Sequence, residues 1–224
     1  MALVIATLFD FDGVLVDSEP VHLAAFNDVL AEHGIAIGER EYAERYLSLD
    51  DAGVFRAVMS REGRTLREEH VRALVAAKGP KFMGRFESAF RVFPGATELV
   101  TRRARRGPVA IVSGALEREI SFALERMGVR SMVAFIVSAE RTPTSKPDPG
   151  PFLFAIEELR RSGHRGSAVV LEDSTGGVTA AKRAGLRCIA VTHSSSRDEL
   201  LRAGADAAVA DLASVTDALL EDAA

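Results

Sequence analysis

Six short apolar runs divide the chain, and each is continuous rather than alternating between apolar and polar residues. They cover residues 3–9, 109–113, 133–138, 168–172, 188–192 and 207–212. A strand that is apolar at every position is buried on both faces, as in a parallel sheet covered by helices. The segments LEREISFALERMG and TGGVTAAKRAG, between later runs, have helical spacing and end at a glycine suited to a left-handed cap. The alternation from residue 109 onward predicts an α/β fold with a doubly wound parallel sheet.

The interval between the first and second runs breaks this alternation. It contains the helical patterns EPVHLAAFNDVLAEHG, EREYAERYL, DDAGVFRAVMSREG and LREEHVRALVAAKGPKFMGRFESAF, and no convincing strand. This pattern predicts a small α-helical domain inserted after the first strand. The turn FPG at residues 93–95 indicates where the chain returns to the sheet. We therefore expect a catalytic core of residues 1–18 and 93–224 and a helical cap of residues 19–92.

The composition is that of an ordinary globular protein, with 47% hydrophobic and 27% charged residues and a net charge of −4. This balance provides no basic field for nucleic acid or an anionic membrane, so we expect neither as a partner. The opening residues MALVIATLFD are too few to span a bilayer and lack a basic leading region, which favours a buried strand and a cytoplasmic protein.

Two other features favour structural roles. Cys188 is the only cysteine and lies in an apolar run, where a small buried side chain is expected rather than a nucleophile or ligand. The basic cluster RRARR at residues 102–106, followed by a glycine, falls late in a helical pattern. Its cations would complement the helix dipole and stay solvated, and a binding patch is disfavoured.

Polar residues follow several of the predicted strands directly. In open parallel sheets, ligands bind beyond the carboxyl ends of the strands, so residues at these positions are candidates for a site. They are Asp10 and Asp12 after the first run, Ser113 and Gly114 after the second, Lys146 in the loop TSKPDP, and the pair Glu172 and Asp173 after the run at 168.

Carboxylates grouped without histidine or cysteine form a hard oxygen site suited to Mg²⁺. An ammonium and a hydroxyl with nearby amides beside such an ion suit a phosphoryl group. An EF-hand calcium loop is excluded, because Gly13 is fourth rather than sixth in the segment and a strand-like run precedes it. The remaining alternative, that Asp10 and Asp12 merely cap a turn, does not account for the lysine and the second acid pair at other strand ends.

Four short motifs, in this order, resemble those of the haloacid dehalogenase superfamily. They are DFDGV at residues 10–14, VSG at 112–114, KP at 146–147 and EDS at 172–174, and the similarity extends over almost the whole chain. The resemblance is to the branch with a helical cap, which includes phosphoglycolate phosphatases and β-phosphoglucomutases. The dehalogenases of the superfamily lack the second aspartate and need no metal. The presence of Asp12 therefore favours a phosphate rather than a halide substrate.

The resemblance implies a role for each motif residue. Asp10 would be the nucleophile that forms an aspartyl phosphate, and Asp12 the general acid and base. Ser113, Gly114 and Lys146 would bind the phosphoryl group. Magnesium would be held by Asp10, the backbone carbonyl of Asp12, Asp173 and Glu172, the last directly or through water.

The resemblance also directs attention to the cap, where substrate contacts are expected from His22, Ser48 and Asp51. Each has an ordinary alternative: His22 as a solvated or packed helix histidine, and Ser48 or Asp50 as the N-cap of a helix. The segment YLSLDD at residues 46–51 contains no basic pair to hold a second phosphate, and its two aspartates would repel one.

These features favour a magnesium-dependent phosphatase that hydrolyses a small metabolite, a sugar phosphate or phosphoglycolate. The alternatives are a phosphomutase, for which Arg56, Lys81 or Arg85 would have to supply the missing cations, and a phosphate-binding module without turnover. A monomer is expected, because the helical patterns show no apolar stripe left over for an interface.

Overall fold

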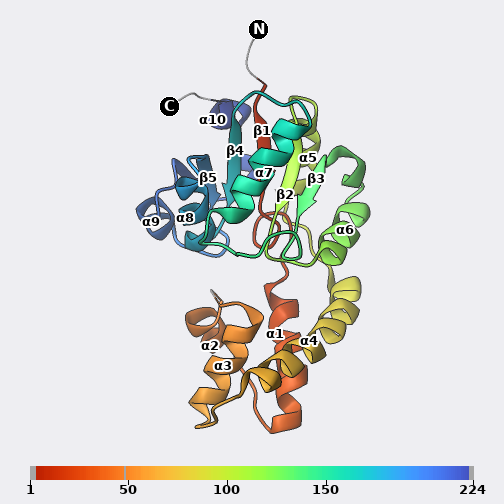
Figure 1. Cartoon of the computed structure of the whole chain (residues 1–224), viewed down its shortest axis with the longest axis vertical. Coiled ribbons are helices and arrows are strands. Elements are labelled where there is room, and N and C mark those ends of the chain that lie inside the picture. The colour runs from red at the N-terminus through yellow and green to blue at the C-terminus, as the bar shows by residue number, and fades with distance from the viewer. Residues whose placement is uncertain (1–3, 48, 222–224) are drawn as a thin grey trace. The chain divides into compact units, whose positions relative to one another are not determined.

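The computed structural model describes residues 4–47 and 49–221, and its chain divides into two units, drawn in Figure 1. The first, here called the core domain, comprises Met1–Asp17 and Arg91–Ala224, and the second, the cap domain, comprises Ser18–Phe90. The divisions after Asp17 and Phe90 lie near the boundaries expected after residues 18 and 92. Each domain is described by itself below.

A parallel sheet organises the core domain. Its strands are β1 (Ala6–Phe9), β2 (Val109–Val112), β3 (Phe135–Val137), β4 (Ala168–Glu172), β5 (Arg187–Val191) and β6 (Ala207–Val209). Their order is β3-β2-β1-β4-β5-β6, and all five pairings are parallel. The doubly wound α/β fold is thus confirmed, with β1 at the centre, where the chain's strand order reverses.

Several strands are shorter than the apolar runs that predict them. The run at 133–138 contains only the three-residue strand β3, which pairs with β2 over Phe135–Val137, and the 3₁₀ helix η2 (Arg130–Met132) precedes the run. The last run likewise pairs only over Ala207–Val209, and its end enters the 3₁₀ helix η3 (Leu212–Ser214). Hydrophobicity reports burial rather than pairing, so it overestimates the length of these strands.

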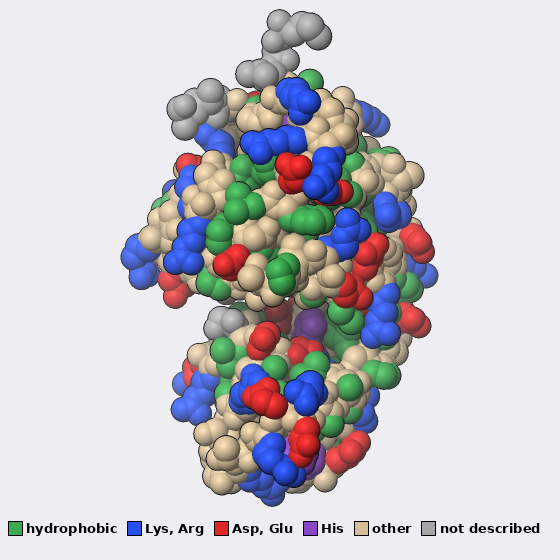
Figure 2. Space-filling model, viewed as in Figure 1, with side chains coloured by type: hydrophobic (Ala, Val, Ile, Leu, Met, Phe, Trp, Pro, Cys, Tyr) green, Lys and Arg blue, Asp and Glu red, His purple; other side chains and the backbone are tan. Residues whose placement is uncertain are grey.

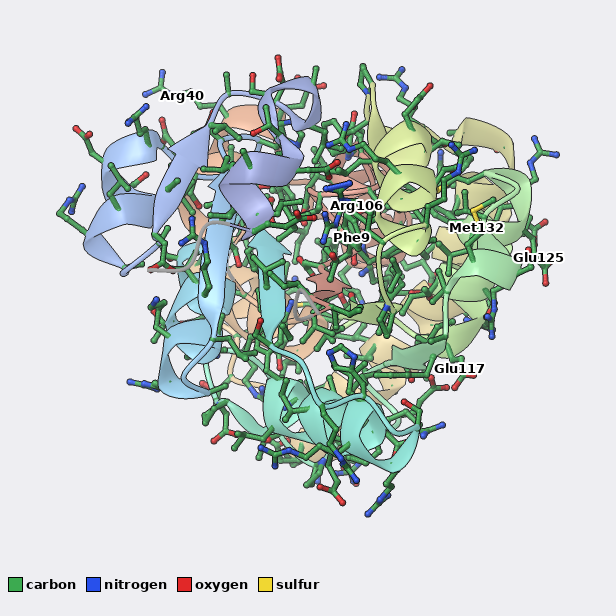
Figure 3. All side chains as sticks on the ribbon, turned by 90° about the horizontal axis from the view of Figure 1, so that it is seen from above. Phe9, Arg40, Arg106, Glu117, Glu125 and Met132 are labelled. Atoms are coloured by element: carbon green, nitrogen blue, oxygen red, sulfur yellow. The ribbon has the colours of Figure 1, made fainter. Side chains whose placement is uncertain are left out.

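Helices cover the sheet on both faces. They are α5 (Ala96–Ala104), α6 (Glu117–Arg126), α7 (Gly150–Arg161), α8 (Thr175–Arg183), α9 (Arg197–Arg202) and α10 (Asp217–Glu221). On one face, Leu8, Val170 and Cys188 of the strands pack with Phe152 of α7 and Val178 of α8. Cys188 is a buried core residue, as expected from its apolar run. In Figure 3, Phe9 lies in the interior, whereas Glu117 and Glu125 of α6 point outward.

The other face of β1 contains a buried cation. Arg103 of α5 is only 1% exposed, and its Nε donates to the hydroxyl oxygen of Thr7 at 3.0 Å. Its Nη1 lies 3.0 Å from a carboxylate oxygen of Asp217 and 2.6 Å from one of Glu221, both on α10. The expectation that the whole cluster at 102–106 stays solvated is therefore wrong for Arg103, because α10 supplies two counter-charges that local sequence does not show.

All the regular secondary structure among the described residues of the cap domain is helical, and loops connect the helices. It contains α1 (Glu19–Leu30), the 3₁₀ helix η1 (Ala31–His33), α2 (Glu39–Arg45), α3 (Asp51–Arg61) and α4 (Glu68–Ala89). Side chains from α1, α2 and α3, among them Phe26, Tyr42 and Phe55, form a separate apolar core. The side chain of Asn27 both donates to and accepts from the backbone of Ile37, at 2.9 and 2.8 Å, which fixes the turn after α1.

Among the described residues, no helix combines the length and the apolar character that crossing a membrane would require. Figure 2 shows basic and acidic side chains interspersed on the visible face, in keeping with the near balance of charges in the sequence.

Replacing Arg103 with Ala should destabilise the core domain by about 3 kcal/mol, because the change breaks a buried charge network and leaves a cavity beside Thr7. Urea unfolding followed by circular dichroism measures this loss. Arg105→Ala is the matched control, since Arg105 is an exposed residue of the same cluster and should change the free energy of unfolding by less than about 0.5 kcal/mol. If both variants lowered the free energy of unfolding by the same amount, the ion pairs of Arg103 with Asp217 and Glu221 would have no special structural role.

Candidate active site

Strand register brings the motif residues to one edge of the sheet. Phe9 at the end of β1 pairs with Leu171 of β4 on one side and with Ile111 of β2 on the other. Asp10 therefore follows β1 beside Glu172, and its amide donates to the carbonyl of Leu171 at 2.9 Å. The two loops on either side of the central strand open here, which is the position where doubly wound sheets bind ligands.

Lys146 joins the two strand ends. Its Nζ lies 2.7 Å from Oδ1 of Asp10 and 2.6 Å from Oε1 of Glu172. The three side chains come from separate loops, and Glu172 is fully buried. Asp10 accepts this one hydrogen bond among the described residues, so its second carboxylate oxygen is available to another group.

Asp173 completes an acidic cluster with Asp10 and Glu172. One potential ligand oxygen from each of the three carboxylates lies within 4.8 Å of the other two, and all three residues are buried. The far oxygen of Glu172, Oε2, accepts from the amides of Asp173 and Ser174 at 3.0 and 3.1 Å and from the Ser174 hydroxyl at 2.9 Å. These donors turn Oε1 of Glu172 toward Lys146 and the cluster.

The crowding of negative charge shifts the ionisation of the cluster. Burial raises the pKa of Asp10 to about 7, with Lys146 lowering and Glu172 raising it. Burial, together with Glu172 and Asp10, raises the pKa of Asp173 well above its ordinary value. Burial opposes the charge of Lys146, but the two carboxylates that it contacts raise its pKa above the usual range. One ammonium therefore does not neutralise three carboxylates.

This donor set fits a hard divalent cation. It consists of carboxylate oxygens without nitrogen or sulfur ligands, which is the chemistry that Mg²⁺ prefers. A divalent charge would also remove the mutual repulsion that keeps the carboxyl pKa values high.

The turn after β1 is packed tightly against this cluster. Gly13 has φ +75, and a Cβ atom there would lie 1.9 Å from Oδ2 of Asp173. Both the left-handed backbone and the missing side chain are therefore required at this position. Asp12, directly before it, is half-buried and bridges to Val16.

The residues expected to bind phosphate follow β2. Ser113 is buried, and its amide donates to the carbonyl of Val137 at 2.9 Å. Its hydroxyl oxygen accepts from the amide of Ala115 at 3.0 Å, which holds the loop in place. Gly114 is exposed, and nothing lies within 4 Å of the position that a Cβ would take. Ser113 and Gly114 thus follow β2, the neighbour of the strand β1 that precedes Asp10, and the backbone at Gly114 is accessible.

The cap residues form a cluster of their own. Lys78 of α4 is only 1% exposed; its Nζ lies 2.8 Å from Nδ1 of His22 and also donates to a carboxylate oxygen of Asp51. His22 stacks on Phe82, with ring centroids 4.3 Å apart. Burial and the neighbouring Lys78 lower the pKa of His22 well below its ordinary value, so its ring is neutral and Nδ1 accepts from the ammonium.

In the loop before α3, Asp50 has a local structural role at the start of the helix. Asp50 is the N-cap of α3, and its side chain accepts from the amide of Gly53 at 2.7 Å. This matches the alternative in which Asp50 starts a helix. Ser48, the other candidate in this loop, lies outside the described residues.

A cavity elsewhere in the core domain does not belong to this site. Its volume is about 1210 Å³, and Ala168 and Arg187, at the amino ends of β4 and β5, line it. The acidic cluster lies at the carboxyl ends of the strands, at the opposite edge of the sheet.

Lys78 and His193 are functional candidates that the sequence does not reveal. Lys78 lies within a charged, amphipathic helix pattern, where a lysine is ordinarily solvated. His193 follows β5, and its place just beyond the end of a strand is the sequence signal that could have identified it. Both acquire their surroundings from residues far away in the chain.

The fold and the site together define an α/β enzyme with a helical cap domain and an oxygen-only acidic centre at the switch point of its sheet. Residues 7–191 match the family model for the haloacid dehalogenase-like hydrolases. The chain belongs to this family.

Individual relatives are similar over nearly the whole chain. A phosphorylated carbohydrates phosphatase of Thermotoga maritima is 31% identical over 214 residues, covering 91% of this chain and 93% of the relative. The chloroplastic protein SUPPRESSOR OF QUENCHING 1 of Arabidopsis thaliana is 32% identical over 212 residues, but the chain spans only 19% of its length. The crystal structure of CbbY from Rhodobacter sphaeroides in complex with phosphate has 27% identity and a TM-score of 0.79, covering 95% of this chain and 96% of that one.

Metal-free protein should become less stable as the pH rises from about 4 to 7, and Mg²⁺ should stabilise it more at pH 8 than at low pH. The folded state holds a proton on Asp10 up to about pH 7, whereas the unfolded chain releases it near 3.8, so stability falls between these values. Thermal unfolding at several pH values, with and without Mg²⁺, measures this change in stability. Each kcal/mol of stability corresponds to about 2–4 °C in the melting temperature.

Asp10→Asn is the matched variant for that measurement, because it removes one titrating group while keeping its size. The stability of this variant should depend less on pH than that of the unsubstituted protein, and Mg²⁺ should stabilise the variant less. A melting temperature that Mg²⁺ leaves unchanged at pH 8 would rule out the proposed cation site.

Proposed function

We propose that this enzyme is a magnesium-dependent phosphatase that hydrolyses phosphate monoesters of small metabolites, such as sugar phosphates or phosphoglycolate, through an aspartyl phosphate. The observation that carries the proposal is the buried cluster of Asp10, Glu172, Asp173 and Lys146 at the carboxyl edge of the sheet. The name of the Thermotoga maritima relative, a phosphatase of phosphorylated carbohydrates, supports the substrate class.

Asp10 is the proposed nucleophile. Lys146 holds its Oδ1, so the other oxygen can attack phosphorus, forming a new O–P bond as the bond to the leaving oxygen breaks. The ammonium also reduces the repulsion between this carboxylate and a phosphate dianion. Water then attacks the aspartyl phosphate, which releases inorganic phosphate and restores the carboxylate.

Asp12 is the proposed general acid and base. As an acid it gives its proton to the leaving alkoxide, and as a base it later takes a proton from the attacking water. The hydroxyl of Ser113 and the amide of Gly114 are proposed to donate to the phosphoryl oxygens, where negative charge grows in the transition state.

Asp10, Asp173, Glu172 and the carbonyl of Asp12 are proposed to hold Mg²⁺. When bound, the ion supplies positive charge to the phosphoryl group and to the nucleophile. The oxygen-only donor set and the excess negative charge support this assignment.

Hydrolysis is favoured over phosphomutase action because the candidate cations of the cap domain already have acidic partners. Each of the three candidates is already paired with a carboxylate: Arg56 with Glu68, Lys81 with Glu32 and Arg85 with Asp28. Asp50 would repel a second phosphate, whereas the charge of Asp51 is paired with Lys78. A binding module without turnover is disfavoured, because nucleophile, acid and lysine are all present.

Purified enzyme should release phosphate from p-nitrophenyl phosphate with Mg²⁺, and EDTA should abolish the release. Asp10→Asn should lower kcat at least about a thousand-fold, because it removes the attacking oxygen's charge. Borohydride trapping during turnover should convert residue 10, and not residue 12, to a reduced aspartyl product seen by mass spectrometry.

Asp198→Asn is the control for this variant, since Asp198 is an exposed acid of α9, and it should keep full activity. The assays contain no sugar bisphosphate, so sustained release of phosphate from a sugar phosphate counts against the mutase. Tight binding of a phosphate analogue with no turnover would instead identify the binding module.

We also propose that His22 and Asp51, together with Lys78, contribute to substrate selectivity, while Ser48 stays a prediction. Lys78→Met should lower kcat/KM for metabolite phosphates about ten-fold and change that for p-nitrophenyl phosphate less than about three-fold, because buried Lys78 holds His22 and Asp51, whose polar contacts only some substrates would make. Lys81→Met is the control, since Lys81 lies on the same helix but pairs with Glu32. Identical profiles for the two variants would show that Lys78 is purely structural.

A further inference from the structure

His193 occupies a position in the core domain that none of the four motifs includes. It follows β5, and its Nδ1 lies 2.7 Å from the carbonyl oxygen of Gly13. A carbonyl oxygen can only accept, so Nδ1 carries the proton and donates. The imidazole ring also stacks on Phe93, with centroids 4.0 Å apart and planes at 15°.

This hydrogen bond completes the restraint of the turn that carries Asp12. The amide of Gly13 donates to the carbonyl of Val16 at 2.9 Å, which orients the peptide plane between Asp12 and Gly13. The carbonyl of Gly13 belongs to the next peptide plane, and among the described residues His193 is its donor. With both planes held, the backbone angles of Gly13 are fixed, and so is the direction of the Asp12 carbonyl.

The stacking contact extends the restraint to the segment around Phe93, which precedes α5. The amide of Phe93 donates to the carbonyl of Leu15 at 3.0 Å, and Val92 bridges to Val16. Phe93 is thus bonded to the same turn whose Gly13 is bonded to His193. One imidazole ring therefore braces the turn through a hydrogen bond on its edge and through a stacked face.

We propose that His193 is a positioning residue for Asp12 and that its hydrogen bond to Gly13 keeps the proton donor in line with the leaving oxygen. The inference rests on the proposed function, in which Asp12 transfers a proton to the alkoxide while the P–O bond breaks. A glycine has no side chain to restrain its own backbone, so a turn that needs φ +75 at Gly13 depends on external donors such as this one. A misplaced general acid transfers its proton less effectively.

Two substitutions separate the hydrogen bond from the stacking. His193→Phe keeps an aromatic face for Phe93 but removes the donor, whereas in His193→Asn the side-chain amide nitrogen takes the place of Nδ1 and keeps the donor. Neither changes a residue that touches the proposed substrate. Their kcat/KM values should be measured with Mg²⁺ on glycerol 2-phosphate and on p-nitrophenyl phosphate.

The two substrates differ in how much they need the acid. An alkoxide must be protonated as it leaves, whereas p-nitrophenolate leaves readily without a proton. His193→Phe should lower kcat/KM about ten-fold for glycerol 2-phosphate and less than about three-fold for p-nitrophenyl phosphate. His193→Asn should restore both values to within about three-fold of the unsubstituted enzyme. The ratio of the two values does not depend on the fraction of folded enzyme, so a merely unstable variant leaves it unchanged.

The possible results are all decisive. Equal losses on both substrates, no loss on either, or failure of His193→Asn to restore the alkyl phosphate would overturn the positioning role. An unsubstituted enzyme that hydrolyses neither substrate with Mg²⁺ would instead refute the proposed function itself. The two failures are distinguished by the unsubstituted enzyme alone.

Discussion

Repulsion among three buried carboxylates, partly offset by Lys146, governs the architecture of the carboxyl edge of the sheet. The lysine contacts Asp10 and Glu172 at 2.7 and 2.6 Å, so a loop before β4 is tied to the ends of β1 and β4. Burial strengthens every one of these interactions, because water does not screen them. The same burial makes any missing counter-charge costly, which is why the cluster is suited to a divalent cation rather than to standing alone.

The carboxylates also dictate where the chain must lack side chains. A Cβ on Gly13 would meet Asp173, and one on Gly177, in the first turn of α8, would lie 1.7 Å from Oε1 of Glu172. The backbone at Gly13 and at Gly177 therefore approaches the acids so closely that no side chain fits between them. The hydroxyl of Ser174 bonds Oε2 of Glu172 and also caps α8 by accepting from the amide of Gly177, at 2.9 and 3.0 Å. One serine thus connects the position of the acid to the start of the helix.

Sequence reasoning succeeded where local pattern determines position. Continuous apolar runs identify buried parallel strands, and parallel strands deliver the residues after them to one edge, so Asp10, Glu172 and Asp173 were predictable as neighbours. It failed where a residue's environment is built from distant segments. Arg103 is buried because α10, more than a hundred residues later, supplies Asp217 and Glu221. Lys78 and His193 are comparable cases, since their partners lie far away in the sequence and local pattern does not predict those contacts.

The two domains use a buried lysine in electrostatically different ways. In the cap, Lys78 faces the carboxylate of Asp51, a neutral His22 and the ring of Phe26 at 4.1 Å, so charge in this cluster is balanced by one acid. In the core, Lys146 faces two carboxylates, and Asp173 adds a third. A balanced cluster needs no further ion and can present polar groups at low cost, whereas the unbalanced one attracts a cation and raises the pKa of its acids. The charge count thus distinguishes a centre whose charges are already balanced from one that attracts a divalent cation, although both are built around the same side chain.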